Sequence, residues 1–207
     1  MSLFLSSIRQ PTGFIVISAH ARDSFERILH KAARTRLARS VDSPCDIAPL
    51  GVRYSAKGDA SVQDDGVALT VRHANVVVLT ISGIDFRMLL VLHFDEDDAT
   101  KAYFVGDDQD KSFREAFLEI SNLCCGAINQ ELLGYFPDLG MSTPYVLSAR
   151  CVPHLMQLKP NHLASWDITL DGSVNLAATL CVCAHAPLDF NAEVSETQDS
   201  GGELELF

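Results

Sequence analysis

The chain has 207 residues, of which 47% are hydrophobic and 8% aromatic, and its 27 acidic and 16 basic residues give a formal net charge of −11. A chain of this length can bury the core of one sizeable domain. The acidic balance argues against nucleic acid and anionic membrane surfaces as partners, because exposed basic groups are needed to bind either of them.

The N-terminal part predicts a short strand and then a helix. Residues 13–18 (GFIVIS) form an apolar run typical of a strand at a sheet edge. Apolar residues then recur at helical spacing over residues 22–39, and Asp23 or Ser24 can cap the start of this helix. The one basic run of the chain lies in this helix and is mixed with its apolar residues.

A long loop and a group of strands are expected next. Residues 40–66 are rich in Pro, Gly, Asp and Ser, and only Val52 to Tyr54 has strand character. We expect a long loop here, or an arm that packs on a partner subunit. Three strands and a short helix are predicted after it, over residues 67–71, 76–82, 88–94 and 95–104.

The longest predicted helix covers residues 112–135. Ser112 and Glu115 have the spacing of a capping box. At about 100° per residue, one face of the helix is apolar and is expected to be buried. This face comprises Phe113, Phe117, Ile120, Cys124 and Ile128.

The opposite face of this helix forms a polar ridge of Glu115, Glu119, Asn122, Gly126 and Asn129. Asn and Gly are both poor residues for a helix interior, and Gly costs about 1 kcal/mol relative to Ala. Gly126 would suit the close approach of another surface. Asn129 either extends this surface or is simply a solvated polar side chain.

The rest of the chain predicts the end of a sheet and a tail. A strand is expected over residues 145–150, and a hairpin joins strands 166–170 and 174–184 through Asp171-Gly172. One domain is expected over residues 1–188. Residues 189–207 are polar and acidic, and we expect a disordered tail there.

The six cysteines fall in predicted helices and strands, which favours free thiols in a reducing cytoplasm. No apolar stretch reaches the roughly 18 residues that span a bilayer, and the N-terminus lacks the pattern of a secretory signal. Cys181, Cys183 and His185 alternate along one strand, but no fourth ligand accompanies them and their spacing is not that of a zinc site. We expect no metal site.

Glu119-Ile-Ser-Asn122, with Gly126 following and Pro144 after a loop, resembles the motif of the CheC/CheX/FliY chemotaxis phosphatases. The likeness is greatest to the CheX-like members, which have a single such site. Their motif has Asp or Ser, then Glu and Asn, and a distant Pro. Glu119, Asn122 and Pro144 match it, whereas Glu115 stands at the first position and the loop to Pro144 is slightly shorter.

The resemblance extends loosely over residues 25–182 and outside the long helix rests on the order of elements. It implies an α/β (α+β) fold, in which a mixed, mainly antiparallel sheet has two long helices, 22–39 and 112–135, packed on one face. Some relatives carry a second catalytic helix at the first of these. Here Glu26 is followed by Leu29 in place of Asn, so we expect no second site.

By resemblance, the chain is expected to hydrolyse the aspartyl phosphate of a CheY-like response-regulator receiver domain. Asn122 would orient the attacking water, and Glu119 would anchor the lysine of the receiver. Glu115, Gly126 and Asn129 would contact the receiver. The receiver supplies Mg²⁺, so this chain needs no metal of its own. CheX-like relatives imply a cytoplasmic homodimer.

Two other functions remain open at this point. The chain could be a non-catalytic binding module that recognises a receiver domain within a signalling or motor-switch complex. It could also be a structural domain whose polar ridge pairs with another subunit, in which case Asn122 and Gly126 would be buried in that contact.

Overall fold

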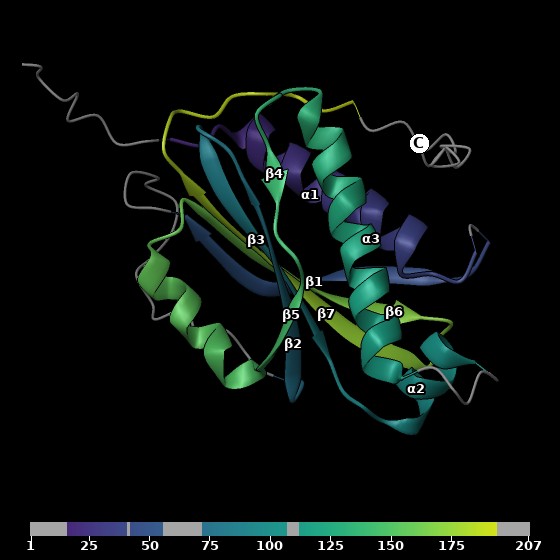
Figure 1. The fold of residues 1–207 in the computed structure, drawn as a ribbon. Helices are drawn as coiled ribbons and strands as arrows, with labels where there is room; N and C mark the ends of the chain where they lie inside the picture. Colours follow the sequence, from purple (N-terminus) through teal and green to yellow (C-terminus); the bar gives the residue numbers. More distant parts are fainter. Residues whose placement is uncertain (1–15, 41, 56–71, 107–111, 194–207) are drawn as a thin grey trace, which may run out of the picture.

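The computed structural model describes residues 16–40, 42–55, 72–106 and 112–193. Within these ranges seven strands form one sheet in the order β1-β6-β7-β3-β2-β4, with β5 also paired to β2 (Figure 1). All pairs of these strands are antiparallel. The strands are β1 Cys45–Ser55, β2 Asn75–Ser82, β3 Phe86–Phe94, β4 Gly140–Met141, β5 Tyr145–Ser148, β6 His162–Leu170 and β7 Val174–Ala184.

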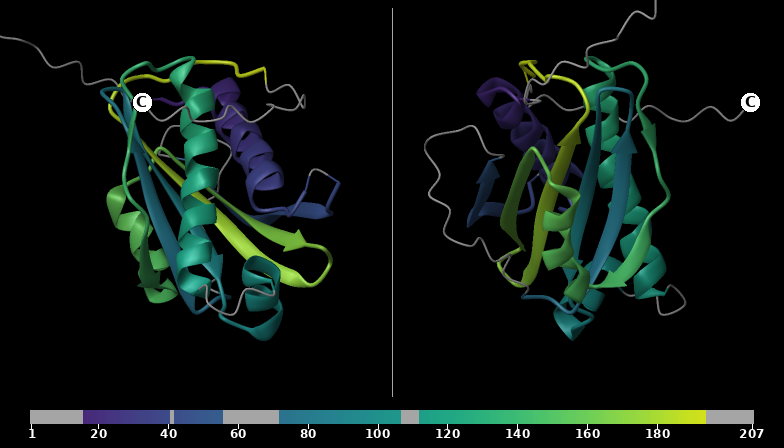
Figure 2. Two further views of the ribbon diagram at one scale, coloured as in Figure 1. Left: turned by 45° about the vertical axis from the view of Figure 1, so that its right-hand side comes forward. Right: turned by 90° about the vertical axis from the view of Figure 1, so that its left-hand side faces the viewer.

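Two long helices, α1 (Ala19–Arg36) and α3 (Phe113–Leu133), pack side by side on one face of this sheet (Figures 1 and 2). A short helix, α2 (Asp98–Val105), lies between β3 and α3 in the chain and is capped by Asp97, whose side chain accepts a hydrogen bond from the Thr100 amide. The predicted fold class is confirmed: a mainly antiparallel sheet carries two long helices on one face.

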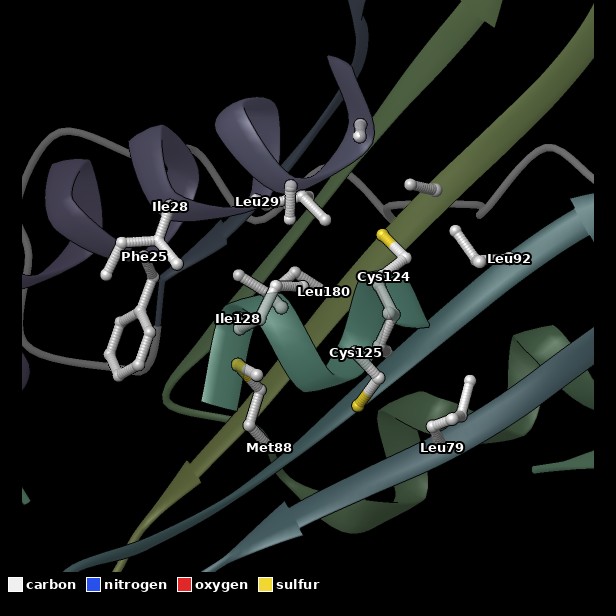
Figure 3. Close-up of a cluster of buried hydrophobic side chains, with 14 of the residues drawn as sticks. Phe25, Ile28, Leu29, Leu79, Met88, Leu92, Cys124, Cys125, Ile128 and Leu180 are labelled. Atoms are coloured by element: carbon white, nitrogen blue, oxygen red, sulfur yellow. The ribbon is translucent and has the colours of Figure 1, made fainter. Parts of the chain in front are cut away.

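The core lies between these two helices and the sheet. Phe25, Ile28 and Leu29 enter it from α1, and Cys124, Cys125 and Ile128 enter it from α3. Figure 3 shows the Cys124 thiol on the side of Leu29 and the Cys125 thiol on the side of Leu79 and Met88. The predicted apolar face of α3 is therefore buried, and Ile120 alone among its members is only partly covered.

The opposite face of the sheet carries a 3₁₀ helix, η1 (Ala149–Leu158), that we did not predict from the sequence (Figure 2). The strand predicted over 145–150 ends at Ser148, where η1 begins. Val152 and Leu155 of η1 pack in a second apolar cluster with Val76 of β2, Leu163 of β6 and Cys181 of β7, among others.

The prediction of a long loop over 40–66 is wrong for its first part. Strand β1 pairs with β6 from Cys45 opposite Leu170 to Ser55 opposite His162, with an irregularity between Leu50 and Arg53. The strand lies at the sheet edge, where polar residues and Pro are tolerated, so its sequence does not look like that of a strand. Residues 56–66 and the predicted strand 67–71 lie outside the described residues.

The N-terminal helix begins earlier than predicted. Ser18 is its N-cap, and its side chain accepts a hydrogen bond from the Ala21 amide, so neither Asp23 nor Ser24 has this role. Of the strand predicted over 13–18, only the last three residues are described. Ile17 forms an isolated parallel bridge with Leu188.

The chain remains packed beyond residue 188, where the predicted domain ends. The Phe190 ring lies 5.1 Å from that of Phe25 and 5.2 Å from that of Phe136. Arg27 donates hydrogen bonds to the Asn191 side chain and to the carbonyl of Ala192, which is itself buried. Residues 189–193 therefore belong to the packed domain, and the predicted tail over 194–207 lies outside the described residues.

No helix in the described ranges is both long and apolar enough to cross a membrane.

Candidate functional site

The polar ridge predicted on α3 lies on the side of the helix that faces away from the sheet. Glu115 and Glu119 are exposed, whereas Asn122, Gly126 and Asn129 are half-buried. All five residues come from one helix, so their relative positions depend on the regular geometry of α3. The described structure thus brings the predicted site residues together on one surface.

An aromatic cluster holds the N-terminal half of α3 against the sheet and α2. The Phe117 ring lies 4.4 Å from Phe94 of β3 and 5.1 Å from Phe104 of α2. Phe113 lies 5.8 Å from the same Phe94 ring. One turn further on, the buried Ser121 hydroxyl donates a hydrogen bond to the Phe117 carbonyl over 2.6 Å. These contacts give Glu119 and Asn122 a rigid support.

The start of α3 differs from the capping box that we predicted. Ser112 is the N-cap residue, but its side chain makes no capping hydrogen bond. Glu115 lies in the first turn, where the helix dipole favours an acidic side chain, and it is exposed. Its carboxylate therefore lies on the ridge with Glu119.

Glu119 and Asn122 present a carboxylate and a carboxamide nearly one turn apart on the ridge. The carboxylate can only accept hydrogen bonds when ionised, so it suits a cationic partner. The carboxamide both donates and accepts without titrating, so it can hold a water molecule in one orientation over a wide pH range. This pair can bind a cation and position water.

Gly126 is not required by the packing of the domain. A Cβ atom built at this position would meet no atom within 4 Å, and the residue has ordinary helical backbone geometry. Alanine would stabilise the helix by about 1 kcal/mol at the same position. The glycine therefore leaves the helix backbone accessible on the ridge without an internal structural reason.

Asn129 is not freely solvated, so the second of our two interpretations of this residue is wrong. Its Oδ1 atom is buried and has no hydrogen-bond partner in the described part of the chain. A buried carbonyl oxygen without a partner carries an unfavourable desolvation free energy. Asn129 thus lies at the border between the ridge and the protein interior.

Pro144 immediately precedes β5, as predicted, in the segment that joins β4 to β5 along the sheet edge. Ser142 continues the pairing across this break, because its amide donates to the Thr80 carbonyl and its hydroxyl accepts from the Thr80 amide, each over 2.9 Å. Figures 1 and 2 show this edge segment running alongside α3. The predicted proline thus lies between β4 and β5, in the segment that follows the sheet edge.

The corresponding position on α1 has a different environment. Glu26 is only 12% exposed, and its Oε1 atom lies 3.4 Å from Nε2 of the buried His162 on β6. Leu29, which stands where the family motif has Asn, is buried in the core. This arrangement agrees with our interpretation of α1 as a structural helix.

The cysteines do not form a cluster of ligands. All six are free thiols, and burial raises the pKa of Cys125 to about 12. In the Cys181, Cys183 and His185 trio the two cysteines are buried and the histidine is exposed. Among the described residues no group of three His, Cys, Asp or Glu side chains could hold a metal ion.

Sequence reasoning missed one feature next to the ridge, the side chain of Leu123, which is 50% exposed. Its position follows from the helical periodicity, which places it between the polar ridge and the apolar face. The same periodicity could have identified it, because Leu123 lies outside the apolar face that we predicted.

No protein-family model matches the chain, and no curated protein matches its sequence. Among solved structures, the chain is similar to the chemotaxis protein CheX from Vibrio vulnificus, with a TM-score of 0.47 and 15% identity over 78% of this chain and 97% of that chain. It is also similar to a chain of the CheX–CheY–BeF3–Mg²⁺ complex from Borrelia burgdorferi, with a TM-score of 0.48 and 11% identity over 77% and 96% of the two chains.

A third similar structure is the middle domain of FliM from Vibrio alginolyticus, with a TM-score of 0.46 and 7% identity over 76% of this chain and 90% of that chain. Two of these structures bear the name CheX, which is also the name of the family members that the sequence resembles. One of them was solved in a complex with CheY.

Proposed function

We propose that the chain is a phosphatase that hydrolyses the aspartyl phosphate of a CheY-like receiver domain. The observation that carries this proposal is the position of Glu119 and Asn122, which lie on the outer face of a rigidly packed helix beside Gly126. Their motif also resembles that of the chemotaxis phosphatases.

In the proposed reaction, water attacks the phosphorus of the acyl phosphate, and the bond between phosphorus and the aspartyl oxygen breaks. The products are the free carboxylate of the receiver and inorganic phosphate. The acyl phosphate is already reactive, so the reaction mainly requires a correctly placed water and stabilisation of the developing charge. The receiver domain brings its own Mg²⁺ and lysine.

Asn122 has the role of holding the water in line with the breaking bond, because its carboxamide can accept one hydrogen bond from the water and donate another to the phosphoryl group. Glu119 has the role of pairing with the receiver lysine, which fixes the position of the two proteins relative to each other. Glu115, Gly126 and Asn129 form the rest of the contact surface. This function belongs in the cytoplasm, and we expect a homodimer.

The test is the decay of phosphate from each receiver domain of the organism that encodes the chain, with and without the protein. We expect acceleration for at least one receiver and a loss of about a hundredfold in turnover for Asn122→Ala, because the water is no longer positioned. Gln157→Ala is the matched control, since it removes an exposed carboxamide from η1, on the opposite face of the sheet.

Binding of the receivers activated with BeF3⁻ is measured in parallel. Acceleration that persists in Asn122→Ala would overturn the assigned role of this residue. Binding without acceleration by the parent protein would overturn the phosphatase and would identify the chain as a binding module for a receiver domain.

A further inference from the structure

Two cysteines of β7 lie in the second apolar cluster, on the face of the sheet that η1 covers. Cys181 and Cys183 are separated by one residue, so their side chains point to the same face of the strand. Cys181 is fully buried and Cys183 is 7% exposed. A buried cysteine in an apolar cluster is ordinarily an inert, small apolar residue. The groups next to the two sulfur atoms therefore decide whether either thiol can react.

A guanidinium group stands across the β ladder from Cys183. Arg87 of β3 is the register partner of Cys183 of β7, and it is exposed. Side chains at such opposed positions lie on the same face of the sheet, with their Cβ atoms about 5 Å apart. On the other side of β7, strand β6 begins at His162, opposite Val182, so its pairing stops short of Cys183. Cys183 thus lies at the end of the ladder beside a cation.

The end of η1 provides a hydrogen-bond acceptor for the same thiol. Cys183 donates a hydrogen bond to the Leu158 carbonyl, with Sγ and O 3.7 Å apart. When Cys183 loses its proton, the sulfur can instead accept from the Arg87 guanidinium and from the Cys181 thiol. Both protonation states of Cys183 therefore have partners, which is uncommon for a cysteine in an apolar cluster.

The thiolate form of Cys183 is the one that these neighbours favour. A hydrogen bond from the Cys181 thiol lowers the pKa of Cys183, and Arg87 acts in the same direction against burial, so that the pKa is about 7. The same hydrogen bond raises the pKa of Cys181, which remains the protonated donor. Cys45 and Cys151 are more exposed, but burial raises the pKa of each. The order of reactivity is therefore the reverse of the order of exposure.

Other charged or titratable side chains also lie at this end of the sheet. Lys159 follows η1, Asp85 precedes β3, and His185 follows β7, where its amide donates to the Asp85 carbonyl. Lys159 and His185 are exposed, so solvent screens them. Arg87 differs from these groups because the β ladder holds it opposite Cys183.

We propose that Cys183 is an oxidation site at which a peroxide converts the thiolate to a sulfenic acid, with Arg87 and Cys181 as positioning residues. The sulfur attacks one oxygen of hydrogen peroxide, so that an S–O bond forms as the O–O bond breaks. Sulfur loses two electrons, which leave with hydroxide, and the hydroxide takes a proton from solvent to become water. The site lies on the face of the sheet opposite the ridge, so the proposal does not depend on the proposed function.

A disulfide between the two cysteines is not the expected product. Residues two apart on a strand have Cα atoms about 6.6 Å apart and nearly parallel side chains, which is at the upper limit for a disulfide. Cys181 therefore serves as a hydrogen-bond donor, and the oxidised form of Cys183 is the sulfenic acid.

The experiment measures the oxidation rate of each cysteine in the full chain. The reduced protein is exposed to hydrogen peroxide at pH 7 for timed intervals, and catalase stops the reaction. The protein is then denatured and alkylated with iodoacetamide, and mass spectrometry gives the fraction of each cysteine that has lost its free thiol. We expect the loss at Cys183 to be about fivefold or more faster than at Cys45 or Cys151.

Arg87→Met tests the role of the guanidinium. Cys183 should then be oxidised about fivefold more slowly at pH 7, and the pH of the half-maximal rate should rise from about 7 to about 8. Arg87→Lys should restore most of the rate, because it keeps the positive charge. Arg150→Met is the matched control, since it removes an exposed arginine at the other end of η1, and it should oxidise like the parent protein.

Two results would overturn the proposal. If Cys45 or Cys151 loses its thiol as fast as Cys183, exposure decides the reactivity and Cys183 is an ordinary buried cysteine. If Cys183 is oxidised at the same rate in Arg87→Met as in the parent protein, the guanidinium has no part in the reaction. Neither measurement uses a receiver domain, so failure of the proposed phosphatase leaves this test unchanged.

Discussion

Lys31 of α1 and Glu131 of α3 form an ion pair, with Nζ and Oε1 2.5 Å apart. Both side chains are partly buried, with 20% and 29% of their surfaces exposed. The pair joins the two long helices on the solvent side of the core. The pair therefore helps to hold α3, the helix that carries the ridge, but it is not one of the ridge residues.

A double-mutant cycle with Lys31→Met and Glu131→Gln should give a coupling free energy of about 0.5–1 kcal/mol, measured by urea unfolding. The control is the pair of Arg114 and Glu96, whose Nε and Oε1 atoms are 2.7 Å apart, because 58% of the Arg114 side chain is exposed. Solvent screens this second pair more strongly, so its coupling should be smaller. An equal or larger coupling for the control pair would contradict this expectation.

Phe117→Leu should lower the free energy of unfolding by about 1–2 kcal/mol, because it removes the ring contacts with Phe94 and Phe104 and leaves unfilled volume. Chemical denaturation measures this change. Leu133→Ala, at a half-buried position of the same helix, should cost less. A larger loss for Leu133→Ala would indicate that the aromatic cluster is not the main support of α3.

Gly126→Ala should raise the free energy of unfolding by up to about 1 kcal/mol, because alanine is a better helix residue and its Cβ would meet no atom within 4 Å. The measurement is again urea unfolding. If the ridge docks closely on a receiver, the same substitution should weaken binding while it stabilises the fold. A variant that is both more stable and equally active would show that nothing approaches the helix at this glycine.

His93 should make the fold less stable in acid. His93 is on β3, which lies between β2 and β7 in the sheet, and its side chain is buried. Its Nε2 atom lies 2.9 Å from Thr179 Oγ1. Burial, together with the nearby His73, lowers the pKa of His93 from 6.5 to about 4. A pKa that is lower in the folded state means that the unfolded chain binds more protons between these values. The stabilising contribution of neutral His93 is therefore fully present above pH 6.5 and is lost as the pH falls towards 4.

The loss from His93 over this range should be on the order of 3 kcal/mol. His30, whose pKa is lowered by burial and by Arg34, contributes in the same direction. Urea unfolding of the parent protein and of His93→Gln between pH 4 and 7 measures the effect, and the variant should show the shallower decline. His185→Gln, at an exposed position, is the control and should follow the parent protein.

The two faces of α3 could be predicted because helical periodicity is a local property of the sequence. Phe117 and Cys124 are buried and Glu119 is exposed, as their spacing indicates. The hairpin at Asp171-Gly172 could be predicted for the same reason, since both residues have positive φ angles of 48° and 64° that suit this dipeptide.

Other parts of the structure depend on contacts between residues far apart in the chain. Strand β1 exists because β6 pairs with it, and its own sequence reads as a loop. The segment after residue 188 is packed because Phe190 finds the rings of α1 and of the turn after α3. Pairing and burial of this kind have no local signature in the sequence. The domain end that we expected at residue 188 is therefore too early.

The sequence by itself therefore determined the ridge, its Glu119 and Asn122, and the apolar face that fixes α3 to the sheet. Only the tertiary structure decided what surrounds the ridge: the edge strand beside it, the half-buried Asn129 and the half-exposed Leu123. The physical reason is that the period of one helix decides which side chains share a face. Which of those faces stays open to a partner depends on how the whole chain packs.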